Sequence, residues 1–219
     1  MGTRITSLAN NFDTTGKLKA AGINNASLSG ITALPAGVAG KMTLLSTQTA
    51  SASASLSFTS GIDSTYDEYW FVFNNVHPAT DNVSFDFNGS TDSGSTYSVT
   101  KTTTLFRSGH DEADTFTQLG YNSNEDLAQS TSYQHIVYGL GNDNDQCVSG
   151  VFKLYNPSST TYVKHFTSTA SNYFASNGNN QMNVAGYFNT TSAIDAIDFK
   201  MSSGNIDDGT IRMYGVSTS

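Results

Sequence analysis

Apolar and polar residues alternate with a period of two through most of the chain after Met42. From Ser51 to Phe58 each serine is followed by alanine, leucine or phenylalanine, which predicts a half-buried strand. Residues 68–76 (EYWFVFNNV) contain a run of consecutive apolar residues from Tyr69 to Phe73, and such a run is typical of a central strand covered on both faces. Further strands are expected at residues 83–87, 97–106, 116–121, 133–140, 148–155, 162–169, 181–188, 194–201 and 210–216.

Turn-forming residues separate these expected strands. They occur at Asn88-Gly89, 142–145 (NDND), Asn156-Pro157, Asn177-Gly178 and Asp208-Gly209, the last closing an expected hairpin. No amphipathic stretch within residues 41–219 predicts a helix. About ten short strands joined by such turns predict an all-β fold. We expect a two-sheet antiparallel β-sandwich that resembles a jelly roll.

The first forty residues differ from the rest of the chain. They are rich in Gly, Ala, Ser and Asn, and their apolar residues are too widely spaced to form one face. Ordering costs about 1–2 kcal/mol per residue, so such a segment orders only against another surface. We therefore divide the chain into an N-terminal docking arm (1–40) and a β-domain (41–219), with a disordered tail as the alternative to the arm. The expected partner contacts are Ile5, Leu8, Phe12, Leu18, Ile23, Leu28, Ile31 and Leu34.

Composition and charge exclude several classes of function. Charged residues make up 13% of the chain, against roughly 25% in ordinary soluble domains. The net charge is −8, and no cluster of Lys and Arg is present to bind a polyanion, so no nucleic-acid partner is expected. No apolar run is long enough to cross a membrane or to form a signal-peptide core. Cys147 is the single cysteine, so we expect folding in a reducing cytoplasm without disulfides.

The densest polar segments do not form a recognisable catalytic motif. Residues 109–114 (GHDEAD) are interpreted as a solvated loop, with a cation or partner contact and catalysis as the weaker alternatives. Residues 142–146 (NDNDQ) are interpreted as a polar turn, with a weak calcium site as the alternative. His135 and His165 lie in expected strands and would face one another if those strands pair. We therefore expect no catalytic residues, no metal site, no cofactor and no enzymatic activity.

Aromatic residues beside amides provide one candidate binding site. Tyr173, Phe174 and Asn177 lie close together in a polar stretch of the chain. Exposed aromatic rings stack on sugars while amides bond to sugar hydroxyls, which makes these three residues candidate contacts for a host surface glycan. The same residue types are enriched in cores and in protein interfaces, which is the alternative interpretation.

Several stretches resemble small virion proteins of marine and cyanobacterial tailed bacteriophages. The resembling segments are residues 24–30 (NNASLSG), 58–66 (FTSGIDSTY), 76–78 (VHP), 141–143 (GND), 155–159 (YNPSS), 185–187 (AGY) and 208–216 (DGTIRMYGV). The resemblance implies a non-enzymatic structural protein, assembled in the host cytoplasm, located in the virion and bound to other capsid or tail proteins. The missing repetitive shaft favours capsid decoration, as a cement protein, over a tail fibre or knob or a glycan-binding adhesin. A homotrimer is expected, because neighbouring copies can cover isolated apolar residues of the arm.

Overall fold

The computed structural model describes residues 42–217, which form twelve strands and no helix. The predicted docking arm and its eight apolar contacts lie outside these residues. The strands are β1 (Met42–Thr49), β2 (Leu56–Phe58), β3 (Glu68–Pro78), β4 (Val83–Ser90), β5 (Lys101–Asp111), β6 (Thr117–Tyr121), β7 (Gln134–Leu140), β8 (Val148–Tyr155), β9 (Lys164–Phe174), β10 (Gly178–Phe188), β11 (Ala196–Met201) and β12 (Ile206–Val216).

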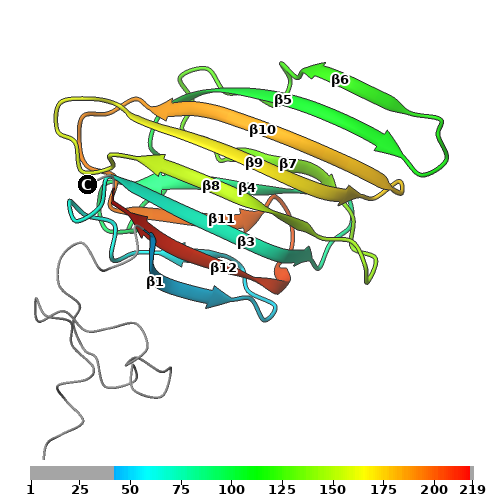
Figure 1. The fold of residues 1–219 in the computed structure, drawn as a ribbon, viewed down its shortest axis with the longest axis horizontal. Helices are drawn as coiled ribbons and strands as arrows, with labels where there is room; N and C mark the ends of the chain where they lie inside the picture. The colour runs from blue at the N-terminus through cyan, green and yellow to red at the C-terminus, as the bar shows by residue number, and fades with distance from the viewer. Residues whose placement is uncertain (1–41, 218–219) are drawn as a thin grey trace, which may run out of the picture. The chain divides into compact units, whose positions relative to one another are not determined.

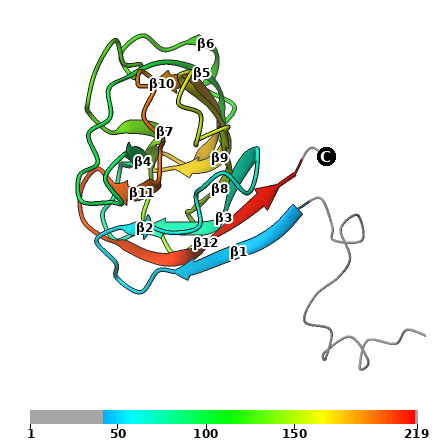
Figure 2. The same ribbon diagram turned by 90° about the vertical axis from the view of Figure 1, so that its left-hand side faces the viewer.

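All strand pairs are antiparallel and belong to one curled, nearly closed sheet. One arm of the sheet has the order β1-β12-β3-β8-β9-β10-β5-β6, and the other has the order β7-β4-β11-β2. A single residue pair, Leu140 with Phe174, joins β7 to β9 and so connects the arms. Figures 1 and 2 show the second arm lying behind β3, β8 and β9. The all-β prediction is confirmed, whereas separate sheets of a jelly-roll sandwich are not, because this bridge links the arms.

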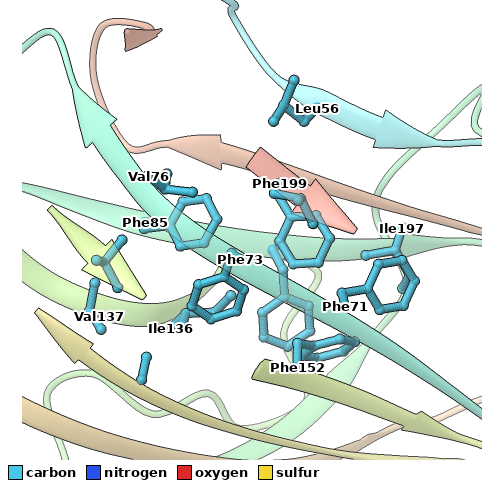
Figure 3. Packing of buried hydrophobic residues seen from close by; sticks show 14 of the residues in the cluster. Leu56, Phe71, Phe73, Val76, Phe85, Ile136, Val137, Phe152, Ile197 and Phe199 are labelled. Atoms are coloured by element: carbon cyan, nitrogen blue, oxygen red, sulfur yellow. The ribbon is translucent and has the colours of Figure 1, made fainter. Parts of the chain in front are cut away.

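Phenylalanine rings fill the space between the two arms. Phe87 of β4 lies 4.4 Å from Phe152 of β8, measured between ring centroids. Phe71 of β3 lies 5.5 Å from Phe199 of β11 in the same way. Figure 3 shows Phe71 and Phe152 meeting Phe85 and Phe199 of the other arm. Each such ring buries a large apolar area and gains edge or stacking contacts, so the aromatic layer is the main source of stability.

Three strand predictions differ from the structure. The strand expected from Ser51 shrinks to β2, because Ala52 adopts φ 51° and breaks the extended backbone. Strand β3 is covered on one face only, since Phe71 is fully buried while Trp70 on the other face is partly exposed beneath the Lys153 ammonium. Strand β1 was not predicted, because its apolar residues do not alternate cleanly.

Two of the predicted turns lie inside strands. Asn88-Gly89 belongs to β4, where Asn88 is fully buried and donates to the carbonyls of Tyr97 and Thr131. Asp208-Gly209 belongs to β12 at a break in the pairing register with β3. Gly209 has φ 117°, a conformation that a β-bulge can require of glycine. The predictions of turns at 142–145, Asn156-Pro157 and Asn177-Gly178 are confirmed.

Candidate ligand-binding site

Two depressions lie at the end of the sheet where β5, β10 and β9 approach β7. Successive residues of a strand point to opposite faces, so Tyr173 and Phe174 line different depressions. Phe174 faces the inner depression, whose volume is about 380 Å³. Tyr173 faces the outer depression, whose volume is about 530 Å³. Asn177 forms the β9–β10 turn between them with φ 58°, so the three predicted glycan contacts do not share one surface.

Arg107 of β5 is the central side chain of the inner depression. Its guanidinium lies between the rings of Phe116 and Tyr138, with 5.2 Å from the guanidinium carbon to each ring centroid. Its Nε donates to Asn180 Oδ1 at 2.9 Å, and its Nη1 donates to the Tyr138 hydroxyl at 3.0 Å. These contacts fix the plane of the guanidinium. They leave Nη2 without an acceptor among residues 42–217.

The charge of Arg107 is not neutralised by a neighbouring carboxylate within the described residues. Asp111 also lines the depression, but its carboxylate accepts bonds from the backbone of Thr115 and Phe116 and from the Thr115 hydroxyl. The hydrogen bond from the Thr115 side chain is the largest factor that lowers the pKa of Asp111. Asp111 therefore stays ionised and holds the β5–β6 turn, while Arg107 keeps donors directed at the depression.

A glycine and two amides lie at or beside the inner depression, and one of them, Asn180, lines it. A Cβ added at Gly109 would lie 2.6 Å from Asn180 Oδ1 and 3.2 Å from Phe116. Any side chain at this position would therefore fill the space beside Arg107. Asn172 of β9 lies opposite Asn180 of β10 in the strand pairing and is 1% exposed. Its side-chain amide has no hydrogen-bond partner among the described residues. The buried amide of Asn172 is therefore an unsatisfied polar group next to Asn180.

The outer depression carries the acidic segment that the sequence analysis singled out. Tyr173 donates from its hydroxyl to Glu112 Oε1 at 2.9 Å, and this bond is the main reason that the pKa of Tyr173 is raised. His110 Nε2 lies 3.1 Å from Asp114 Oδ1. All four side chains are at least partly exposed. The segment is an exposed strand end and turn, and nothing in it positions a nucleophile beside a base.

A second polar cluster lies on the outer face of the smaller arm. His135 Nδ1 lies 2.5 Å from Asp86 Oδ1, and its Nε2 lies 3.4 Å from Glu125 Oε2. Burial lowers the pKa of His135, but the Asp86 hydrogen bond and the two negative charges outweigh it and raise the pKa overall. Asp198 accepts from Ser57 and from the Tyr133 hydroxyl. The contacts of Glu125 and Tyr133 attach the segment that precedes β7 to the sheet.

The predictions for the histidines and for the polar turn at residues 142–146 had different outcomes. His135 and His165 do not face one another, since β7 meets β9 only at Leu140 and Phe174, and His165 packs against Tyr187 instead. Residues 142–146 form a turn that is closed by a bond from the Gln146 amide to the Asp143 carbonyl. Within residues 42–217 no group of three or more His, Cys, Asp or Glu side chains is arranged to hold a metal ion.

Arg107 was not singled out from the sequence. The available signal was its inward position in the alternation Thr103, Leu105, Arg107, where a charge is unusual. The described residues contain no helix that could cross a membrane. Searches against protein-family models, curated proteins and solved structures found no match for this chain.

Proposed function

We propose that this chain is a non-enzymatic structural protein of a tailed-phage particle, which docks through residues 1–40 and displays its β-domain on the particle surface. Capsid decoration, as a cement protein, is the first candidate location. The two arms of the curled sheet would then be the sheets of a jelly-roll-like sandwich. Support comes from the resemblance of the described segments to virion proteins and from one feature of the domain surface.

That feature is a broad uncharged face on β9, β10, β5 and β6, which lie side by side in Figure 1. The outward strand residues of this face include no Asp, Glu, Lys or Arg, and carboxylates from adjoining turns contact it at three positions, Glu112 at Tyr173, Asp114 at His110 and Asp126 at Tyr121. Leu119 is 74% exposed and Tyr121 55%, both on the edge strand β6, and Phe106 of the neighbouring strand β5 is 42% exposed. The face consists of Thr102, Thr104, Phe106, Ser108, His110, Thr117, Leu119, Tyr121, His165, Thr167, Thr169, Ser171, Tyr173, Asn179, Gln181, Asn183, Ala185 and Tyr187.

The uncharged face suits contact between copies of this chain. Each copy has a net charge of −8, so copies repel one another wherever acidic surfaces meet. An interface between them is least costly where charges are absent and apolar side chains are exposed. The number of residues in this face is close to the roughly 20–30 residues that each partner contributes to a standard interface. This supports the homotrimer expected from the sequence.

The proposal is tested by locating the chain in purified phage particles. Mass spectrometry should find it in intact particles at a stoichiometry that fits the capsid, and cryo-electron microscopy should place the β-domain on the outer surface. Removal of residues 1–40 should abolish incorporation. Absence of the full chain from particles would contradict the proposal, and a location at the tail would replace decoration with the tail-fibre or knob alternative.

Glycan binding by a host-attachment module is the second candidate function. The observation that favours it is the inner depression, which combines aromatic rings, a charged fork and small size. Ligand sites in proteins typically measure about 300–1,000 Å³, so this depression is large enough for a small ligand. Binding of the full chain to a glycan array tests this candidate, and an array without any binding would remove it.

A further inference from the structure

We propose that the inner depression binds the carboxylate of an acidic sugar residue, such as a uronate, through Arg107. The inference rests on the second candidate function, glycan binding, and specifies its ligand class. It does not depend on where the chain sits in a particle. The residues that carry it are Arg107, Phe116, Tyr138 and Asn180, and the missing side chain of Gly109 lets Asn180 and Phe116 approach the backbone of β5.

The guanidinium of Arg107 is preorganised for an anion. Two aromatic rings contact it, and Asn180 and Tyr138 accept bonds from its Nε and its Nη1. Its Nη2 has no acceptor, and the guanidinium has no carboxylate partner, among residues 42–217. A carboxylate can accept charge-assisted N–H bonds from Nη2 and from the second hydrogen of Nη1, and contacts between arginine and a carboxylate are among the strong polar contacts in proteins. A fixed side chain also loses little rotational entropy on binding.

The surroundings of Arg107 favour a sugar as the carrier of that carboxylate. Phe116 and Phe174 line the same depression with their rings 6.3 Å apart, and they offer apolar surface to a pyranose ring. Ser176 and Asn82 line the depression as well and supply groups that bond to hydroxyls. Asp111 faces the same space, so the ligand carboxylate has to bind on the Arg107 side. The volume of about 380 Å³ lies at the lower end for ligand sites, as expected for one sugar unit.

Apart from Asp111, which lines the depression, the negative charges of the chain oppose an acidic ligand mainly at long range. Charges farther away than the Debye length, about 8 Å at physiological ionic strength, are largely screened. The contact between Arg107 and a carboxylate is direct and is screened much less. Binding of an acidic sugar should therefore weaken by less than about threefold between low and physiological salt, unlike the binding of a polyanion to a basic patch.

Comparing a sugar acid with its methyl ester tests the contribution of the ligand's carboxylate charge. The full chain is titrated with methyl galacturonoside and with the methyl ester of the same sugar, and binding is followed by ligand-observed and protein-observed NMR. We expect the acid to bind at least tenfold more tightly than the ester and to shift the Arg107 Nε–H resonance. Acetate should bind at least tenfold more weakly than the uronate, because it makes no ring contacts. Equal binding of acid and ester, or of acetate and uronate, would overturn the proposal.

Two variants test the binding site, and a control variant and unfolding measurements show whether the fold is intact. Arg107→Gln should abolish the preference for the acid, whereas Arg212→Gln, a matched change on β12 far along the sheet from β5, should leave it unchanged. Ser176→Trp should block the mouth of the depression while Arg107 remains, and Ser176 is exposed, so the fold should tolerate it. Thermal unfolding of each variant checks folding. Binding of the uronate that survives both Arg107→Gln and Ser176→Trp would place the ligand elsewhere and contradict the proposal.

Failure of the acidic-sugar proposal can be distinguished from failure of glycan binding itself. If the full chain binds neutral glycans on an array but shows no preference for acid over ester, glycan binding stands and the acidic ligand class is wrong. If it binds no glycan of either kind, both fail. Incorporation into particles is measured separately and is unaffected by either result.

Discussion

Lys101 is completely buried, and its ammonium donates to Asn88 Oδ1 and to the carbonyls of Val99 and Ser132. Burial lowers the pKa of Lys101 to about 7. The unfolded chain keeps this proton up to about pH 10.4, so between these values the unfolded state binds more protons and stability rises with pH. We expect a gain on the order of 1–2 kcal/mol from pH 7 to 9 that is missing in Lys101→Met.

The measurement is urea unfolding of both proteins at the two pH values. Lys153→Met is the control, since Lys153 lies on the outer face of β8 above Trp70 and is partly exposed. It should keep the pH slope of the original chain. A slope that persists in Lys101→Met would show that other groups cause it.

The pair of His135 and Asp86 gives a pH effect of opposite sign. Because the folded pKa of His135 is raised, the ion pair stabilises the fold below the unfolded pKa of about 6.5, and this contribution is lost as pH rises through the folded value. Asp86→Asn should lower the pKa of His135 in an NMR titration and should destabilise the chain more at pH 6 than at pH 8.5. Glu125→Gln should have a smaller effect, because Glu125 lies farther from the ring. An unchanged His135 titration in Asp86→Asn would exclude this coupling.

At the scale of single strands, side-chain packing explains why Gly89, which the sequence placed in a turn, lies inside a strand. Gly89 lies inside β4, and a Cβ there would come within 2.8 Å of the Phe188 ring, which packs against Phe166. The ring is fully buried and has little room to move. Gly89→Ala should therefore destabilise the chain by about 1–3 kcal/mol in urea unfolding. Gly120→Ala on β6, where a Cβ meets nothing within 4 Å, should change stability by less than about 0.5 kcal/mol.

The same strands show what local sequence could predict. Residues 148–155 alternate between buried and partly exposed positions except at Gly150, and the predicted bounds match β8. The Asn88-Gly89 pair has strong turn chemistry, but tertiary contacts override it, since the Asn88 amide bonds to two distant carbonyls. Ala52 carries no signal in the sequence for its positive φ. Periodicity thus located the strands, whereas their ends depended on contacts between segments far apart in the chain.

Across the β-domain, the candidate site depends on topology that periodicity does not encode. Arg107 and Asn180 lie on the paired strands β5 and β10, and the curling of the sheet brings Tyr138 of β7 to them. The aromatic residues Tyr173 and Phe174 were predicted to act together, but the alternation of the strand directs them to opposite faces. Had this alternation been applied to residues 164–174, the two side chains could have been separated from the sequence alone.

At the scale of the whole molecule, the last prediction concerns self-association of copies through the uncharged face. If copies meet there, a carboxylate at its most exposed apolar position is desolvated at the interface and repels the net negative charge of the neighbouring copy. Leu119→Glu in the full chain should therefore weaken assembly at least tenfold, as measured by the concentration dependence of mass in light scattering.

Leu44→Glu is the matched control, because Leu44 is 53% exposed and lies on β1, at the opposite end of the strand order from β6 and outside the uncharged face. It adds the same charge to the molecule and should leave assembly unchanged within about twofold, since charge added far from the contact is screened. Equal loss of assembly in both variants would attribute the effect to net charge rather than to this face. An original chain that stays monomeric at every concentration would remove the face as a contact between copies, and residues 1–40 would then have to bind a different virion protein.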